Sequence, residues 1–204
     1  MQTTTQAALA PSLVATRSSR TLSEVALVLI GTAVLVASAK ISVPFYPVPM
    51  TLQTLAVMAI AAAYGTRLGT LTVLAYLAEG FGGLPVFTAT PPMIAGPAYF
   101  LGPTGGFLAG FVLLALVVGY AADRGWGRSV VKLFAAMLAA DVVVFALGFA
   151  WLAWFAHLSS GHMGTGASVA WAHGVVPFVL GDVLKIALAS MLIPAAWGLV
   201  GRRG

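Results

Sequence analysis

The chain has 204 residues, of which 60% are hydrophobic and 7% are charged, and its mean hydropathy is +1.01. This composition excludes an ordinary water-soluble domain and is typical of a protein that lies in lipid. The net charge of +5 comes from basic residues scattered at the ends of apolar segments, without the basic runs of a nucleic-acid-binding protein. Because there is no cysteine, disulfides, thiolate metal sites and a cysteine nucleophile are also excluded.

The N-terminal segment 1–20 differs in composition from the rest of the chain. It is rich in Ser, Thr and Ala, and Arg17 and Arg20 directly precede the first apolar stretch. That stretch has about 20 residues, which is longer than the apolar region of a signal peptide. We therefore predict a disordered cytoplasmic tail at 1–20 and a single transmembrane domain at 21–204.

Apolar segments follow one another through the rest of the chain. A membrane-spanning helix needs about 20 apolar residues. The sequence therefore predicts an all-α fold of six transmembrane helices near 22–41, 51–64, 68–81, 104–122, 129–155 and 175–200. The second and third are short for a full crossing, and the fifth is long enough to include an interfacial turn.

Arginines mark one side of the predicted bundle. They fall at the N-terminus, in the connections 2–3 and 4–5, and at the C-terminus, as Arg17, Arg20, Arg67, Arg124, Arg128, Arg202 and Arg203. The outer connections 42–50, 82–103 and 156–174 contain no Lys or Arg. The positive-inside rule then places both termini in the cytoplasm of a multi-pass protein of the cell membrane.

The outer connections concentrate proline, glycine and aromatic residues, as in the segments 43–50, 82–87 and 102–106. Proline removes a backbone donor, so such segments can fold back at membrane depth with fewer unsatisfied groups. These segments are interpreted either as rigid lids over a cavity or as ordinary short loops, in which Pro and Gly commonly form the turns between helices.

Asp182 and Lys185 lie inside the last apolar segment. A charge at the centre of a membrane helix costs about 2.5–3.5 kcal/mol on insertion scales, so both side chains are expected to face the protein interior or a wet cavity. Residues three apart share a helix face. The pair is either a ligand site or an internal salt bridge that only holds helices together.

Four ordered motifs carry a resemblance to a known family. They are PVPMTLQTL at 47–55, GLPVF at 83–87, GPTGG at 102–106 and GDVLK at 181–185. Together they resemble the BioY family, the substrate-binding S components of energy-coupling-factor (ECF) biotin transporters. The resemblance covers about 22–200. It implies a six-helix bundle that captures biotin from outside and delivers it inward, with a T component and two ATPase subunits as partners. We expect no cofactor.

Biotin has a ureido ring, an apolar thioether ring, an aliphatic tail and a carboxylate, and polar residues of the chain can bind several of these groups. Asp182 can accept a ureido N–H, and Lys185 can donate to the ureido carbonyl or to the carboxylate. Gln53 can donate and accept, although it could instead cap a helix or bond between helices. Glu79 could bind the ligand or pair with Lys40.

Aromatic residues and small residues complete the predicted contacts. Candidate walls for the ring and tail are Phe45, Tyr46, Phe87 and Tyr99, each of which could instead be an interfacial anchor. Ala33 and Ala37 form a small-xxx-small ridge in the first helix. By resemblance this ridge would dock the T component, and ordinary packing inside the bundle is the alternative.

Other functions have weaker support in the sequence. The histidines His157, His162 and His173 with Asp182 suggest a membrane-embedded metal-dependent enzyme, but their spacing matches no helical metal motif. A channel would need rings of repeated polar residues, which are absent. An S component for another vitamin would keep the same fold. Asp141, a further intramembrane acid, has no assigned role.

Overall fold

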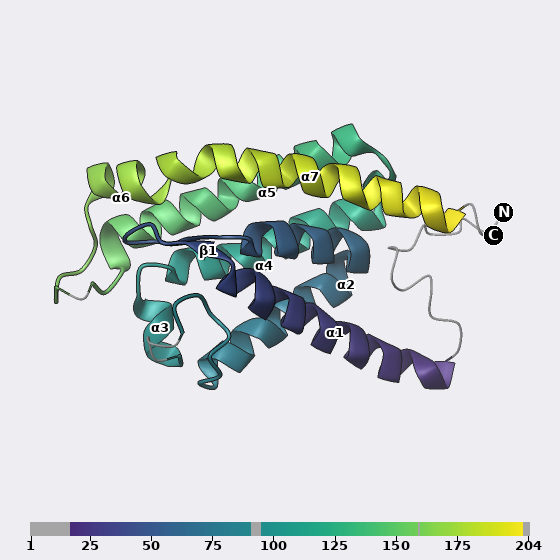
Figure 1. The fold of residues 1–204 in the computed structure, drawn as a ribbon, viewed down its shortest axis with the longest axis horizontal. Helices are drawn as coiled ribbons and strands as arrows, with labels where there is room; N and C mark the ends of the chain where they lie inside the picture. Colours follow the sequence, from purple (N-terminus) through teal and green to yellow (C-terminus); the bar gives the residue numbers. More distant parts are fainter. Residues whose placement is uncertain (1–16, 91–94, 159, 202–204) are drawn as a thin grey trace.

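The computed structural model describes residues 17–90, 95–158 and 160–201, which form a bundle of long helices (Figure 1). Residues 1–16, which include most of the predicted tail, lie outside this part, as do Arg202 and Arg203. The long helices are α1 (Arg17–Lys40), α2 (Gln53–Phe81), α4 (Gly105–Asp123), α5 (Val130–Ala150) and α7 (Val176–Gly201). The short elements are α3 (Pro97–Leu101), α6 (Ala167–Gly174), the turns η2 (Trp126–Arg128) and η3 (Trp151–Phe155), and the antiparallel pair β1 (Ser42–Val43) and β2 (Met50–Thr51).

Helix α2 is a hairpin of two antiparallel helices. The chain reverses at Gly65, where φ is 79° and ψ is −178°, a conformation that is essentially restricted to glycine. The Gln53 amide donates a 2.8 Å hydrogen bond to the Tyr76 hydroxyl 23 residues later, whereas a straight helix would separate these residues by about 35 Å. The described residues contain five long apolar helical segments. Because one of them is this hairpin, the prediction of six transmembrane helices is confirmed.

The two ends of the bundle have different connections. In Figure 1, the start of α1, the turn of α2, η2 and the end of α7 lie at one end, whereas β1, α3 and α6 lie at the other. The first end carries Arg67, Arg124 and Arg128. By the positive-inside rule this is the cytoplasmic end.

The cytoplasmic end is closed by close backbone packing. Asp123 Oδ2 accepts hydrogen bonds from the backbone N–H and the hydroxyl of Thr66, at 2.9 and 2.6 Å, and so caps the second helix of the α2 hairpin. A Cβ placed on Gly119 would lie 2.6 Å from the Thr66 Cα. Helix α4 therefore packs directly against the turn at Gly65.

The outer end contains elements that hydropathy did not predict. The short helices α3 and α6 and the pair β1–β2 lie in segments expected to be loops, because elements of two to eight residues give no periodic signal. The predicted helix 129–155 is α5 followed by the π turn η3. There the Trp151 indole N–H donates to the Gly102 carbonyl at 2.9 Å, which ties η3 to the connection before α4.

Candidate functional site

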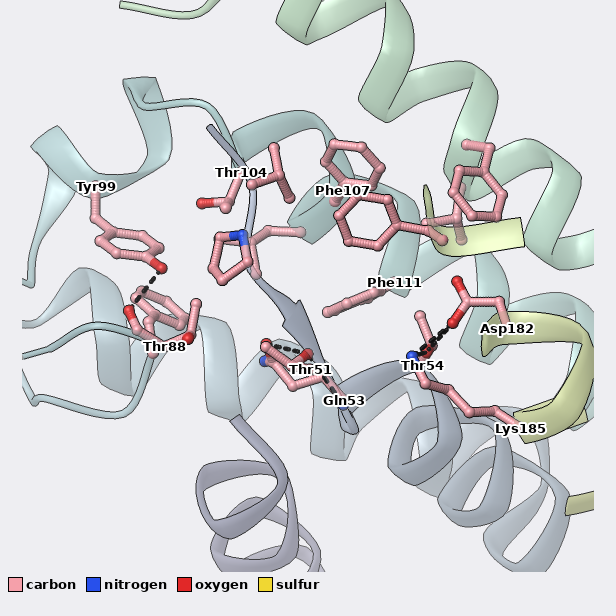
Figure 2. A pocket seen from close by; sticks show the side chains of 17 residues that line it. Thr51, Gln53, Thr54, Thr88, Tyr99, Thr104, Phe107, Phe111, Asp182 and Lys185 are labelled. Atoms are coloured by element: carbon pink, nitrogen blue, oxygen red, sulfur yellow. Dashed lines mark hydrogen bonds and ion pairs between the residues drawn. The ribbon is translucent and has the colours of Figure 1, made fainter. Parts of the chain in front are cut away.

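A cavity of about 60 Å³ lies beside the start of α2 (Figure 2). The first helix of the α2 hairpin has only 12 residues before Gly65 and spans about 18 Å, less than the thickness of the hydrocarbon core. Polar side chains lie in one part of the cavity wall, from Thr51, Gln53, Thr54, Asp182 and Lys185. Aromatic side chains form much of the remainder, from Phe87, Tyr99, Phe107, Phe111, Phe145 and Phe178.

A larger chamber of about 710 Å³ adjoins this cavity. Its walls come from the connections that include 42–49, 88–89, 98–104 and 157–158. The two spaces share four residues, here called the collar: Pro49, Thr88, Tyr99 and Thr104. Small-molecule sites typically have volumes of about 300–1,000 Å³. The outer chamber is therefore large enough for a vitamin-sized molecule, and the collar leads from it to the polar inner cavity.

Asp182 and Lys185 form an ion pair at the inner cavity. The Lys185 ammonium lies 2.6 Å from Asp182 Oδ1 and donates to the Thr54 hydroxyl at 3.1 Å. That hydroxyl donates to the same Asp182 oxygen at 3.0 Å. The Lys185 side chain is 11% exposed and the Asp182 side chain 6%, so the pair is largely desolvated. Among the described residues these contacts leave one ammonium donor and Asp182 Oδ2 without a protein partner, and Figure 2 shows this second oxygen turned toward the aromatic side chains.

Gln53 is held by a second polar network. Its amide N–H donates to the Tyr76 hydroxyl, which donates to the Val86 carbonyl at 3.1 Å. Its amide oxygen accepts from the Thr51 hydroxyl at 3.2 Å. Gln53 therefore bonds between helices, as one of the sequence alternatives proposed, and it also lines the cavity. The network joins both helices of the α2 hairpin to the outer connection that follows them.

Phe87 and Tyr99 form an aromatic wall of the cavity. Their rings are stacked with centroids 4.7 Å apart, and Phe87 is only 1% exposed. A Cβ on Gly80 would lie 2.0 Å from the Phe87 ring, so glycine is needed at this position to make room for it. The Tyr99 hydroxyl donates to the Thr88 carbonyl at 2.9 Å. Burial raises the pKa of Tyr99 more than its hydrogen bond to Thr104 lowers it, so the phenol stays a neutral donor.

The other two predicted aromatic residues lie farther out. Phe45 and Tyr46 line the outer chamber and are 42% and 78% exposed. Phe45 contacts Phe178 of the inner cavity, with ring centroids 6.0 Å apart. The structure therefore places the four predicted aromatic residues along the path from the outer chamber to the inner cavity. Phe45 and Tyr46 lie in the chamber, Tyr99 at the collar and Phe87 at the inner cavity.

Several predicted residues lie away from this path. Glu79 lines neither space, and among the described residues it forms no ion pair with Lys40, whose ammonium instead binds backbone carbonyls. Ala33 and Ala37 are exposed on α1, so they do not pack inside the bundle. Asp141 lines a separate groove of about 340 Å³. It is 4% exposed, and its Oδ1 has no hydrogen-bond partner in the described part of the chain.

The histidines do not assemble a metal site. Across residues 17–90, 95–158 and 160–201, no three His, Asp, Glu or Cys side chains are grouped so that they could hold a metal ion. His157 lines the outer chamber, and its backbone pairs with Met163. The structure thus gives no support to a metal-dependent enzyme built from these residues.

Sequence reasoning missed part of the cavity lining. Thr54 lies in the motif at 47–55, but nothing in that motif shows that its hydroxyl would form hydrogen bonds with Asp182 and Lys185 in the last helix. Phe107 and Phe111, one helical turn apart in α4, give a usable spacing signal for a shared face. Phe145 and Phe178 give none, because apolar side chains on a membrane helix face lipid as readily as protein.

Comparison with known proteins identifies the family. Residues 7–202 match the model of the BioY family. A biotin transporter BioY from Thermotoga maritima is 37% identical over 80% of this chain and 89% of its own length. A probable biotin transporter BioY from Pyrococcus horikoshii is 33% identical, over 83% and 93%. A crystal structure of the S-component for biotin from an ECF-type ABC transporter shares the fold, with a TM-score of 0.73 and 23% identity over 90% of this chain and 95% of that one. The chain is an integral membrane protein that belongs to the BioY family.

Proposed function

We propose that the protein is the substrate-capture S component of a biotin uptake transporter and has no catalytic activity of its own. It takes biotin from the outer side of the membrane and delivers it inward together with a T component and ATPase subunits. The observation that supports this most directly is the Asp182–Lys185 pair, which lies at the inner cavity behind the collar. The relatives named as biotin transporters support the choice of ligand.

The remaining hydrogen-bonding capacity of the pair matches biotin. Lys185 keeps one ammonium donor and Asp182 keeps Oδ2 as an acceptor, while a ureido group presents a carbonyl acceptor and an N–H donor. Hydrogen bonds to charged groups contribute about 1.5–3 kcal/mol each. Phe107 and Phe111 offer apolar contact for the thioether ring, while the outer chamber has room for the tail.

Binding requires the inner cavity to widen. At about 60 Å³ it is smaller than a typical ligand site, whereas the outer chamber falls within the usual range. A ring that reaches the ion pair must therefore displace side chains at the collar. Tyr99 and Thr88 belong to connections rather than to long helices, so they can move while the bundle stays intact.

The test is calorimetric titration of the detergent-purified protein with biotin, with riboflavin and thiamine as control ligands. We expect selective binding of biotin and a loss of affinity of about 10- to 100-fold in Lys185→Ala. The matched control is Lys132→Ala, because Lys132 is exposed near the cytoplasmic end. No binding by folded wild-type protein would refute the biotin assignment, and unchanged binding by Lys185→Ala would reduce the pair to a structural salt bridge.

The same assay decides the orientation of the ligand. Biotin methyl ester keeps the ureido ring and lacks the carboxylate charge. If Lys185 meets the ureido carbonyl, the ester and biotin depend on Lys185 to the same extent. If Lys185 meets the carboxylate, the ester binds weakly and Lys185→Ala changes its affinity little.

A further inference from the structure

Lys40, the last residue of α1, makes an unusual set of contacts. Its ammonium donates to the carbonyl oxygens of Pro85 and Phe87, both at 2.7 Å, and to the carbonyl oxygen of Thr90. The Thr90 hydroxyl oxygen lies 3.3 Å away. All these acceptors belong to one segment, 85–90, so a single cation gathers the carbonyl groups of this outer connection.

The segment 85–90 forms part of the wall of the proposed binding site. Phe87 and Thr88 both line the inner cavity, and Thr88 also belongs to the collar. The segment has little regular backbone pairing and is held by side chains: Tyr76 donates to the Val86 carbonyl, and Tyr99 donates to the Thr88 carbonyl. Within the segment the Thr90 hydroxyl donates to the Phe87 carbonyl at 2.6 Å, and Lys40 supplies the charged contact from outside it.

The conformation of the segment needs such support. Ala89 has φ of 56°, in the left-handed region that a non-glycine residue adopts at a cost of about 1 kcal/mol or more. Carbonyl groups that converge on one point also repel one another unless a cation or donor lies between them. The Lys40 ammonium meets both needs, because a positive charge that carries three N–H donors can bind several carbonyls at once.

We propose that Lys40 is a positioning residue for the ligand, which holds the segment 85–90 so that Phe87 and Thr88 face the cavity. This inference rests on the proposed function. Lys40 is the last residue of α1, so its contacts link this helix directly to the site. The exposed side of the same helix carries Ala33 and Ala37. A displacement of the outer end of α1 would then be transmitted to the cavity wall.

The experiment compares Lys40→Met, Lys40→Arg and the control Lys132→Met in the full chain. We expect Lys40→Met to bind biotin about tenfold more weakly, Lys40→Arg to stay within about threefold of wild type because it keeps the donors, and Lys132→Met to be unchanged. Phe87→Ala is then combined with Lys40→Met. If Lys40 acts only through the wall, the double variant binds no more weakly than Phe87→Ala alone.

Hydrogen exchange without ligand supplies a readout that does not depend on biotin. Backbone amides of 86–90 should exchange faster in Lys40→Met, while those of α4 should stay protected. Unchanged exchange and affinity in Lys40→Met would overturn the inference, and so would losses that add fully in the double variant. If folded wild-type protein bound no biotin, the proposed function would fail, and the exchange data would still decide whether Lys40 holds this segment.

Discussion

The cytoplasmic end and the outer end of the bundle are built in different ways. At the cytoplasmic end, backbones meet closely at Gly65 and Gly119, and Asp123 caps a helix. At the outer end, the connections are longer and side chains such as Lys40 and Trp151 bind their carbonyls. Close packing gives the first end stability, whereas side-chain support at the second end leaves room for a cavity. Substitutions at the two ends should therefore have different effects.

Asp182→Asn is expected to have the largest effect. The amide keeps the shape of the side chain but removes the charge that Lys185 pairs with, so biotin affinity should fall about 10- to 100-fold in a calorimetric titration. Circular dichroism should show that the helices are retained. The matched control is Asp123→Asn at the cytoplasmic end, which should bind biotin as wild type does. Equal losses of affinity in both variants would contradict the division between the two ends.

Gly65→Ala tests the closed end. Because φ of 79° with ψ of −178° disfavours a side chain, the substitution should lower the free energy of unfolding by about 1–3 kcal/mol. Thermal unfolding in detergent measures this loss, and biotin affinity should change little. Gly198→Ala in α7 is the control, since a Cβ there would meet no neighbouring atom within 4 Å. If the two variants melted alike, the turn at Gly65 would not be a source of stability.

The double substitution of Ala33 and Ala37 by leucine should have the smallest effect on the isolated protein. Both residues are exposed on α1, so unfolding and biotin affinity should each change by less than about 0.5 kcal/mol. If the ridge docks the T component, the larger side chains should reduce copurification with that partner. Normal copurification would assign the docking surface to another part of the chain.

Helix α1 shows how far local sequence information reaches. In the most apolar stretch of α1, 28% of the residues are buried inside the protein, compared with 67% in the corresponding stretch of α4. Both stretches have a mean hydropathy of 2.1. Hydropathy therefore predicted both helices correctly and could not tell which one is central. In lipid, an apolar side chain is equally stable against a neighbouring helix or against the bilayer, so burial leaves little trace in composition.

The sequence predicted the contact between one pair of charged residues but not the partners of a third. The spacing of Asp182 and Lys185 predicted a shared helix face, which the 2.6 Å ion pair confirms. For Lys40 the sequence suggested a partner in Glu79, and the structure shows backbone carbonyls instead. A carbonyl is present at every residue, so no sequence pattern marks the ones that a lysine will bind.

The sequence by itself determined the membrane class, the six helices, the cytoplasmic side and the polar motifs, because hydropathy, charge and residue spacing are local properties. The tertiary structure alone decided that Thr54 joins the ion pair, that Phe145 and Phe178 face the cavity, and that Lys40 supports its wall. These contacts join segments far apart in the chain. They depend on how the helices pack and where the outer connections fold back, which no single segment encodes.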